Sequence, residues 1–139
     1  MICLLFIVGA VSAQHTIIGA DYWIRDGHMT TGARFGAIGE GNIAGGYVSF
    51  SDTRPFEYAA PQIPVYRNSM CAGYVYDAEY MFLYVGVGVL AESVAGYPLP
   101  TKFCFESGVL FRMLDNWGMG FNIGNTGHTH LRMSMFVNI

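Results

Sequence analysis

Three side chains near the C-terminus are of the types that nucleophilic catalysis uses. Ser134 could act as a nucleophile and His128 or His130 as its base, with a carboxylate of a neighbouring segment orienting the imidazole. His130 and Ser134 are separated, however, by more than about 10 Å along an extended strand, and no sequence motif joins them. We interpret them as polar residues of a loop and of the protein interior, and we predict no catalytic residues.

The same histidines are poor candidates for a metal site. His128 and His130 form an H-x-H pair that could place two imidazoles on one face of a strand, but no cysteine or third histidine is near them in the sequence. There is no glycine-rich phosphate loop followed by a helical segment. The net charge of −3 and the lack of a basic cluster argue against nucleic acid. We therefore predict no metal, no cofactor and no nucleic-acid partner.

Large apolar side chains occupy nearly every odd position from residue 103 onward, while small, polar or charged ones occupy the even positions. Successive side chains of a strand point to opposite faces, so this period of two predicts strands with one apolar and one polar face. The apolar set is Phe103, Phe105, Val109, Phe111, Met113, Trp117, Met119, Phe121, Ile123, Leu131, Met133, Met135, Val137 and Ile139. Earlier segments show the same two faces, but the phase is ambiguous at Tyr47 and Val48.

The composition indicates which face meets water. The chain is 53% hydrophobic and only 12% charged, whereas roughly a quarter of the residues of a typical soluble domain are charged. Its polar face carries mainly glycine, asparagine and serine. Such a face suits the crowded interior of a small closed barrel, so we expect the apolar face to contact lipid. A soluble, lipocalin-like barrel with its apolar face inside is a less favoured alternative, ranked below the two membrane-protein functions considered below.

Residues 1–13 have the features of a secretory signal peptide. Ile2–Val11 is apolar, and Val11-Ser12-Ala13 forms a small-x-small cleavage site before Gln14. The apolar run of about ten residues is half the length that a transmembrane helix needs. We therefore expect an exported protein with one mature domain, residues 14–139.

The mature domain divides into eight strand-like runs of roughly ten residues, the pattern of the smallest transmembrane barrels. We predict strands at Thr16–Arg25, Met29–Ile38, Ile43–Ser51, Ser69–Asp77, Tyr80–Glu92, Lys102–Met113, Asn116–Gly124 and His130–Asn138. The second, fourth and sixth connections are short, whereas the third (Asp52 to Asn68) and fifth (Ser93 to Thr101) are long and contain all five prolines. The sequence thus predicts an all-β, eight-stranded, antiparallel up-and-down transmembrane β-barrel with short periplasmic turns and longer outer loops.

Two cysteines fall on the polar side of this pattern. Cys71 and Cys104 lie on the fourth and sixth predicted strands, with the fifth between them. Two strand spacings would separate their Cα atoms by about 10 Å, whereas a disulfide bond spans roughly 7 Å between Cα atoms. We expect two thiols in the lumen and no disulfide bond.

Charged residues on the predicted inner face should neutralise one another. The interior of an eight-stranded barrel is just wide enough to be filled by side chains, so a diffusion pore is not expected. A buried charge needs a partner of opposite sign. We predict a luminal polar network of Asp21, Arg25, Arg34, Glu106, Arg112 and Arg132. We also predict an aromatic girdle of Tyr76, Phe111 and Trp117 near the short turns.

The pattern as a whole resembles the small eight-stranded outer-membrane proteins of Gram-negative bacteria, of the OmpA/OmpX type. The resemblance covers the mature chain and includes the segments Phe82–Gly88 and Gly108–Arg112 and the aromatic last strand Met135–Ile139. It implies residence in the outer membrane, contact with outer-membrane lipid, and a structural, adhesive or surface-interaction role as a monomer. Enzymes also exist on this fold, so the resemblance leaves a lipid-modifying enzyme, of the lipid A acyltransferase or deacylase type, as the alternative. The long connection from Ser51 to Asn68 is the candidate contact with an extracellular ligand.

Overall fold

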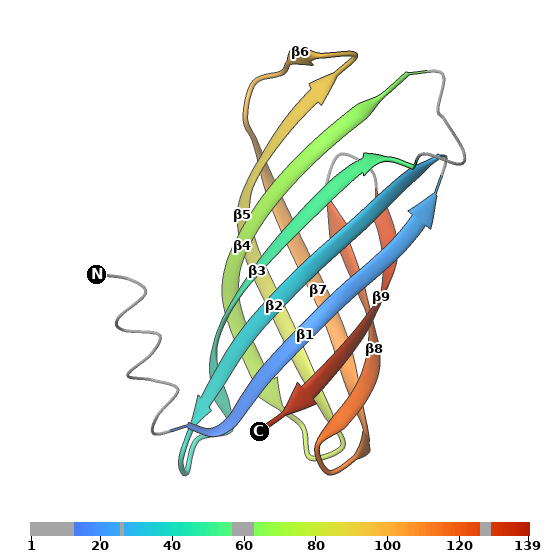
Figure 1. Ribbon diagram of the computed structural model, residues 1–139. Coiled ribbons are helices and arrows are strands. Elements are labelled where there is room, and N and C mark those ends of the chain that lie inside the picture. The colour runs from blue at the N-terminus through green and yellow to red at the C-terminus, as the bar shows by residue number, and fades with distance from the viewer. Residues whose placement is uncertain (1–12, 26, 57–62, 126–128) are drawn as a thin grey trace.

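The computed structural model describes residues 13–25, 27–56, 63–125 and 129–139, which form eight long antiparallel strands and one short strand (Figure 1). The long strands are β1 (Ala13–Arg25), β2 (His28–Gly39), β3 (Ala44–Pro55), β4 (Val65–Asp77), β5 (Met81–Val94), β7 (Lys102–Leu114), β8 (Trp117–Asn125) and β9 (Thr129–Asn138). The two-residue strand β6 (Tyr97–Pro98) pairs with the end of β5. These residues include no helix that is long and apolar enough to cross a membrane.

The eight long strands close into a barrel. Each long strand pairs antiparallel with the next long strand along the chain, and β1 pairs antiparallel with β9 from Ile17–Asn138 to Tyr22–Met133. Reciprocal backbone hydrogen bonds between Thr16 and Ile139, with N···O distances of 3.1 and 3.0 Å, continue this pairing. The structure therefore confirms the predicted eight-stranded, antiparallel up-and-down barrel.

The two ends of the barrel differ. We call the end with the tight β2–β3, β4–β5 and β7–β8 turns the lower end, and the opposite end, where β6 lies, the upper end (Figure 1). Gly41 in the β2–β3 turn has a φ of 74°, a conformation that glycine adopts without steric cost. Strands β4 and β5 extend beyond β1 and β9 at the upper end, so one wall of the barrel is taller than the other.

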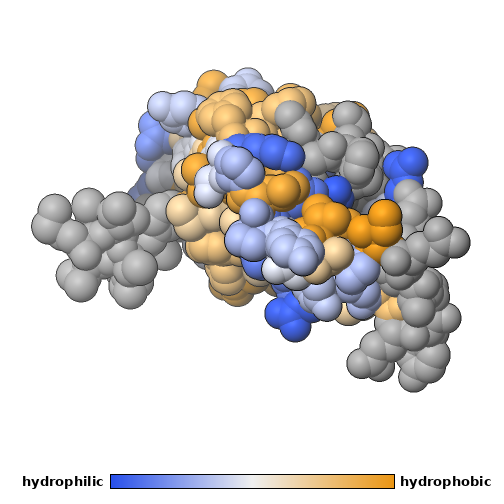
Figure 2. Space-filling model, turned by 90° about the horizontal axis from the view of Figure 1, so that it is seen from above, coloured by the Kyte–Doolittle hydropathy of each residue, from blue (hydrophilic) through white to orange (hydrophobic). Residues whose placement is uncertain are grey.

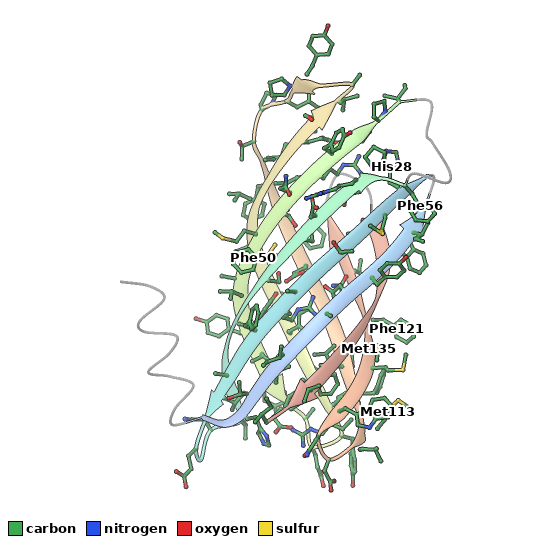
Figure 3. All side chains as sticks on the ribbon, viewed as in Figure 1. His28, Phe50, Phe56, Met113, Phe121 and Met135 are labelled. Carbon is green, nitrogen blue, oxygen red and sulfur yellow. The ribbon has the colours of Figure 1, made fainter. Side chains whose placement is uncertain are left out.

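The alternating pattern sorts the side chains as the sequence predicts. Outward positions such as Val85, Val87 and Phe121 are exposed, whereas their neighbours Tyr84 and Asn122 are buried. Figure 3 labels Phe121 and three other outward apolar residues, Phe50, Met113 and Met135. The lipocalin-like alternative is therefore wrong, because it requires the apolar face to be enclosed.

The third strand, whose phase the sequence leaves ambiguous, turns Tyr47 inward. Tyr47 is 2% exposed, and its neighbour Val48 is only half-buried. The reason is local volume: on the inner face the Tyr47 ring lies beside Gly86 of β5, where a Cβ atom would overlap the tyrosine hydroxyl. An aromatic ring and a glycine on nearby strands together fill the space that two medium-sized side chains would fill.

Two predictions about the connections are wrong in extent. The long third connection, expected from Asp52 to Asn68, is shorter because β3 continues to Pro55 and β4 begins at Val65. Pro55 and Pro98 also lie within strands rather than in loops. Pro55 is the last residue of β3 and Pro98 belongs to the short β6, and strand ends and short outer strands are the positions where a missing backbone donor is tolerated.

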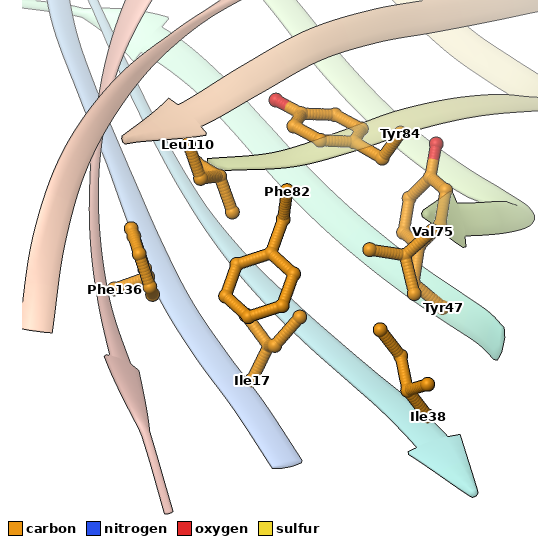
Figure 4. Close-up of a cluster of buried hydrophobic side chains, with 8 residues drawn as sticks. All are labelled: Ile17, Ile38, Tyr47, Val75, Phe82, Tyr84, Leu110 and Phe136. Carbon is orange, nitrogen blue, oxygen red and sulfur yellow. The ribbon is translucent and has the colours of Figure 1, made fainter. Parts of the chain in front are cut away.

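The lower part of the lumen is filled by apolar and aromatic side chains (Figure 4). The cluster consists of Ile17, Ile38, Tyr47, Val75, Phe82, Tyr84, Leu110 and Phe136. Phe82 and Phe136 meet edge to face with ring centroids 5.6 Å apart, a geometry that the aromatic quadrupole favours.

The predicted signal peptide, residues 1–13, lies outside the described residues except for Ala13.

Replacement of an outward apolar residue by arginine should destabilise the barrel in a bilayer. Val85 is 56% exposed in the middle of the apolar run of β5, and an arginine at the bilayer midplane costs about 2–4 kcal/mol. We expect Val85→Arg to lower the free energy of unfolding in lipid vesicles by that amount in a denaturant titration. Tyr97→Arg, on β6 beyond the apolar run, is the matched control and should have little effect. Equal denaturation midpoints for the two variants would contradict the lipid-facing assignment.

Candidate functional site

The centre of the lumen holds an arginine between two carboxylates. Arg34 of β2 is 1% exposed, and its Nη1 and Nη2 donate hydrogen bonds of 3.3 and 3.0 Å to the two carboxylate oxygens of Asp21 on β1. Its Nη2 also lies 3.5 Å from Oε2 of Glu106 on β7. This two-pronged geometry suits a guanidinium, which presents its donors as a rigid fork.

Neutral side chains complete this central cluster. Asn122 Nδ2 donates to Asp21 Oδ2 at 3.2 Å, and the Ser49 hydroxyl donates a short hydrogen bond to Glu106 Oε1. The Tyr84 ring lies below the guanidinium, with the Arg34 Cζ atom 4.0 Å from the ring centroid, a cation–π contact. The cluster therefore draws on six strands of the barrel, and each buried charge has a partner.

The cavity beside this cluster is very small. It is lined by Ile17, Arg34, Gly36, Tyr47, Val75, Tyr84 and Leu110 and has a volume of about 10 Å³. A cavity needs at least about 10–15 Å³ to hold one water molecule. This cavity is therefore at the lower limit for holding a single water molecule.

A second ion-pair group lies at the lower end. Arg112 Nη2 is 2.6 Å from Asp77 Oδ2, and its Nη1 donates to the Glu79 carbonyl oxygen at 2.9 Å. His15 Nε2 lies 3.3 Å from the same Asp77 oxygen. This group ties the β4–β5 turn to β7 and places Arg112 apart from Glu106.

A third group lies at the upper end. The carboxylate of Glu92 on β5 is 2.8 Å from Arg67 Nε and 3.0 Å from Lys102 Nζ. Glu92 is 8% exposed, so the two cations neutralise a carboxylate that is largely removed from water. Sequence reasoning missed this group, because Arg67 was assigned to a loop and Glu92 to the end of a strand; the inward parity of Arg67, shared with Cys71, was the available signal.

The six residues of the predicted luminal network thus have different surroundings. Asp21, Arg34 and Glu106 lie together in the central cluster, whereas Arg112 belongs to the lower group. Arg25 is the last residue of β1, and it is exposed at the upper end. Arg132 pairs in register with Asn122, and its side chain lies outside the described part of the structure, as do those of His128, His130 and Ser134.

Cys71 and Cys104 are both buried thiols with no disulfide bond between them, as expected, but their side chains lie closer together than a flat sheet would place them. The Sγ atoms of Cys71 and Cys104 are 3.4 Å apart. The estimate assumed a flat sheet, in which side chains two strands apart run parallel to each other. In a narrow barrel the inner face is concave, so inward side chains of such strands converge.

The predicted girdle residues lie on the outside near the lower end. Tyr76 stands one residue before the end of β4, and Trp117 is the first residue of β8. Phe111 pairs with Met81, the first residue of β5. All three side chains are exposed. Tyrosine and tryptophan at this height suit a membrane–water interface, where amphipathic rings prefer to lie.

A groove opens on the outside of β2, β3 and β4 toward the upper end. It has a volume of about 570 Å³ and is lined by Thr31, Gly32, Ala33, Phe50, Ser51, Asp52, Asn68, Ser69 and Met70. Asp52 is paired there with Arg54, at 2.5 Å between Oδ2 and Nε. The lining includes no histidine, and the described residues hold no group of three or more potential metal ligands.

The central cluster should be sensitive to the removal of its cation. Arg34→Met leaves the carboxylates of Asp21 and Glu106 buried without the arginine, and breaking a buried pair typically costs about 3–5 kcal/mol. Glu106→Gln keeps the Asp21–Arg34 pair and should cost less. Glu40→Gln, in an exposed turn, should leave stability unchanged. Urea titrations in detergent micelles give the order, and an Arg34→Met midpoint equal to that of Glu40→Gln would contradict it.

Trp117 should lie at the membrane interface. In a Trp23→Phe background, lipids brominated close to the headgroup should quench Trp117 fluorescence more than lipids brominated deep in the acyl chain, because β8 begins at this residue. The matched control is Phe121→Trp with Trp117→Phe, which moves the probe four residues along β8, away from the lower turn and deeper into the bilayer, on the same outward face. Its quenching should favour the deeper bromines. Identical depth profiles for the two probes would contradict the assigned interface.

Comparison with known proteins shows that the chain is similar in fold to several solved structures, but it identifies no sequence family. No protein-family model matches the chain, and no curated protein matches it. A structure described as a de novo designed transmembrane β-barrel is 12% identical with a TM-score of 0.54, covering 90% of this chain and 92% of that chain. Neisserial surface protein A (NspA) is 15% identical with a TM-score of 0.50, covering 89% and 91% respectively.

The attachment invasion locus protein Ail of Yersinia pestis is similar to the same degree. It is 18% identical with a TM-score of 0.54, and the match covers 89% of this chain and 92% of that chain. Identities this low establish the fold and no more. Together with the closed ring of strands and the outward apolar face, the matches show that the chain has the fold of the small eight-stranded transmembrane β-barrels, the fold that its sequence resembles.

Proposed function

We propose that the protein resides in the outer membrane of a Gram-negative bacterium as a structural and surface-interaction barrel whose lumen is closed by its own side chains. The observation that carries the proposal is the central cluster, in which Arg34 bridges Asp21 and Glu106 across the lumen. The apolar cluster lies below it and the Glu92 group lies above it, and both support this proposal. A barrel filled in this way supports a scaffold or surface protein rather than a channel.

Support for surface contacts comes from the upper end. Figure 2 shows hydrophilic and hydrophobic residues side by side around this end of the barrel. Ile63, Tyr66 and Tyr97 are exposed on the β3–β4 connection, β4 and β6, at 59%, 44% and 76%. The region from Ser51 to Asn68, our candidate ligand contact, therefore presents exposed apolar side chains at Ile63 and Tyr66. The names of NspA, a surface protein, and Ail, an attachment protein, are consistent with this role.

The lipid-modifying enzyme is the alternative function. It needs a histidine, a serine and a carboxylate that converge at the outer lipid boundary. The groove on β2–β4 offers Asp52, Ser51 and Ser69 but has no histidine in its lining. The side chains of the candidates His128, His130 and Ser134 lie outside the described residues, so the enzyme remains the second candidate function, and we infer that this groove is a contact surface for outer-leaflet lipid.

Conductance measurements test the closed lumen. The purified barrel in a planar lipid bilayer should give no discrete current steps, whereas a sixteen-stranded porin measured alongside should give them, because only the larger barrel has an aqueous channel. Arg34→Gly, which removes the side chain that spans the lumen, should raise the conductance of folded protein above that of the wild type. Regular current steps from the wild-type barrel would overturn the proposal.

A further inference from the structure

Two thiols meet in the upper half of the lumen. Cys71 on β4 and Cys104 on β7 are 4% and 0% exposed, and they form a small buried cluster with Leu90. Their Sγ atoms are 3.4 Å apart, although the residues belong to strands that do not pair with each other. To reach the S–S bond length of about 2.0 Å, the sulfur atoms must approach by about 1.4 Å while the two Cα atoms come within the roughly 7 Å that a disulfide bond spans.

Gly88 of β5 makes this approach possible. It is the register partner of Cys71 on one side and of Cys104 on the other. A Cβ atom at position 88 would overlap the Met70 carbonyl oxygen and come within 2.7 Å of the Cys71 Cα atom. Glycine therefore permits the close approach of β4 to β5 at this point, and the intervening strand carries no side chain between the register positions of the two cysteines.

We propose that Cys71 and Cys104 form an intramolecular disulfide bond, tying β4 to β7 across β5, when the chain folds in an oxidising compartment. The oxidant is a disulfide, either of low molecular weight or on a thiol oxidoreductase. One cysteine thiolate attacks it to give a mixed disulfide and releases the first thiol of the oxidant. The second cysteine thiolate then displaces the other thiol, so both cysteines lose a proton and two electrons pass to the oxidant.

The burial of the pair determines when this exchange occurs. Buried thiols in apolar surroundings react slowly, because only an accessible thiolate attacks a disulfide. The bond should therefore form while the chain is folding, before the barrel closes and buries the two cysteines beside Leu90. Once buried, it should be protected from reductants. The inference depends on the barrel fold and not on the proposed surface role. From the proposed function it takes only export, which brings the chain into an oxidising compartment.

The test is refolding in a redox buffer. The mature chain is refolded from urea into detergent micelles with an excess of oxidised over reduced glutathione, and remaining thiols are then alkylated in denaturant. Heat-modifiable mobility on a gel identifies the folded fraction. We expect its mass to be lower than that of the reduced chain by two hydrogen atoms, with no alkylation, and a proteolytic fragment in which the two cysteine peptides are joined. Its urea midpoint should exceed that of barrel refolded under reducing conditions.

Single variants provide the controls. Cys71→Ser and Cys104→Ser should fold, should lack the joined fragment, and should have the same urea midpoint with or without oxidised glutathione. If folded wild-type barrel carries two alkylated cysteines, or a glutathione adduct on one of them, the geometry does not permit the bond and the inference is overturned. Joined fragments between two chains in place of the intramolecular one would overturn it as well.

Discussion

The closure of the sheet between β1 and β9 is the constraint on which the rest of the structure depends. A strand in lipid has no water to hydrogen-bond its backbone, so each N–H and C=O group must find a partner in a neighbouring strand. The register from Ile17–Asn138 to Tyr22–Met133, continued by the reciprocal bonds of Thr16 and Ile139, completes that ring. Eight strands make a narrow ring, and the narrowness governs what each inner position can hold.

The narrow interior imposes two conditions at once. The side chains must fill the space, which accounts for the Tyr47 ring beside Gly86 and for the edge-to-face contact of Phe82 with Phe136. Any charge among them must also be neutralised at short range, because a charge removed from water without a partner is costly. Arg34 meets both conditions, since its long side chain fills the centre while its guanidinium contacts Asp21, Glu106 and the Tyr84 ring.

The sequence was sufficient to predict which face of the sheet a residue occupies, because that depends on its odd or even position in a strand. It was insufficient to predict contacts that depend on the curvature of the sheet or on the position of a residue along the barrel axis. The period of two assigned residues such as Val85 and Asp21 to the correct faces, because each face of a strand is set by the residue's own position. It did not reveal that Cys71 and Cys104 touch, since that contact follows from the concave inner face. It also grouped Arg112 with Glu106, whereas the structure separates them along the barrel axis, because a shared face says nothing about relative height. The Glu92 group was missed for a different reason, because Arg67 was assigned to a loop, whereas β4 already begins at Val65.

The pairing of large inner side chains with glycines on nearby strands bears on how such a protein changes during evolution. The packing of the lumen constrains a summed volume and a summed charge over several strands, not the identity of a residue at one position. A larger side chain at position 86 becomes acceptable only if position 47 becomes smaller, so substitutions inside the barrel should accumulate as compensating pairs. Two barrels can differ in this way at most of their inner positions and keep the same ring of strands.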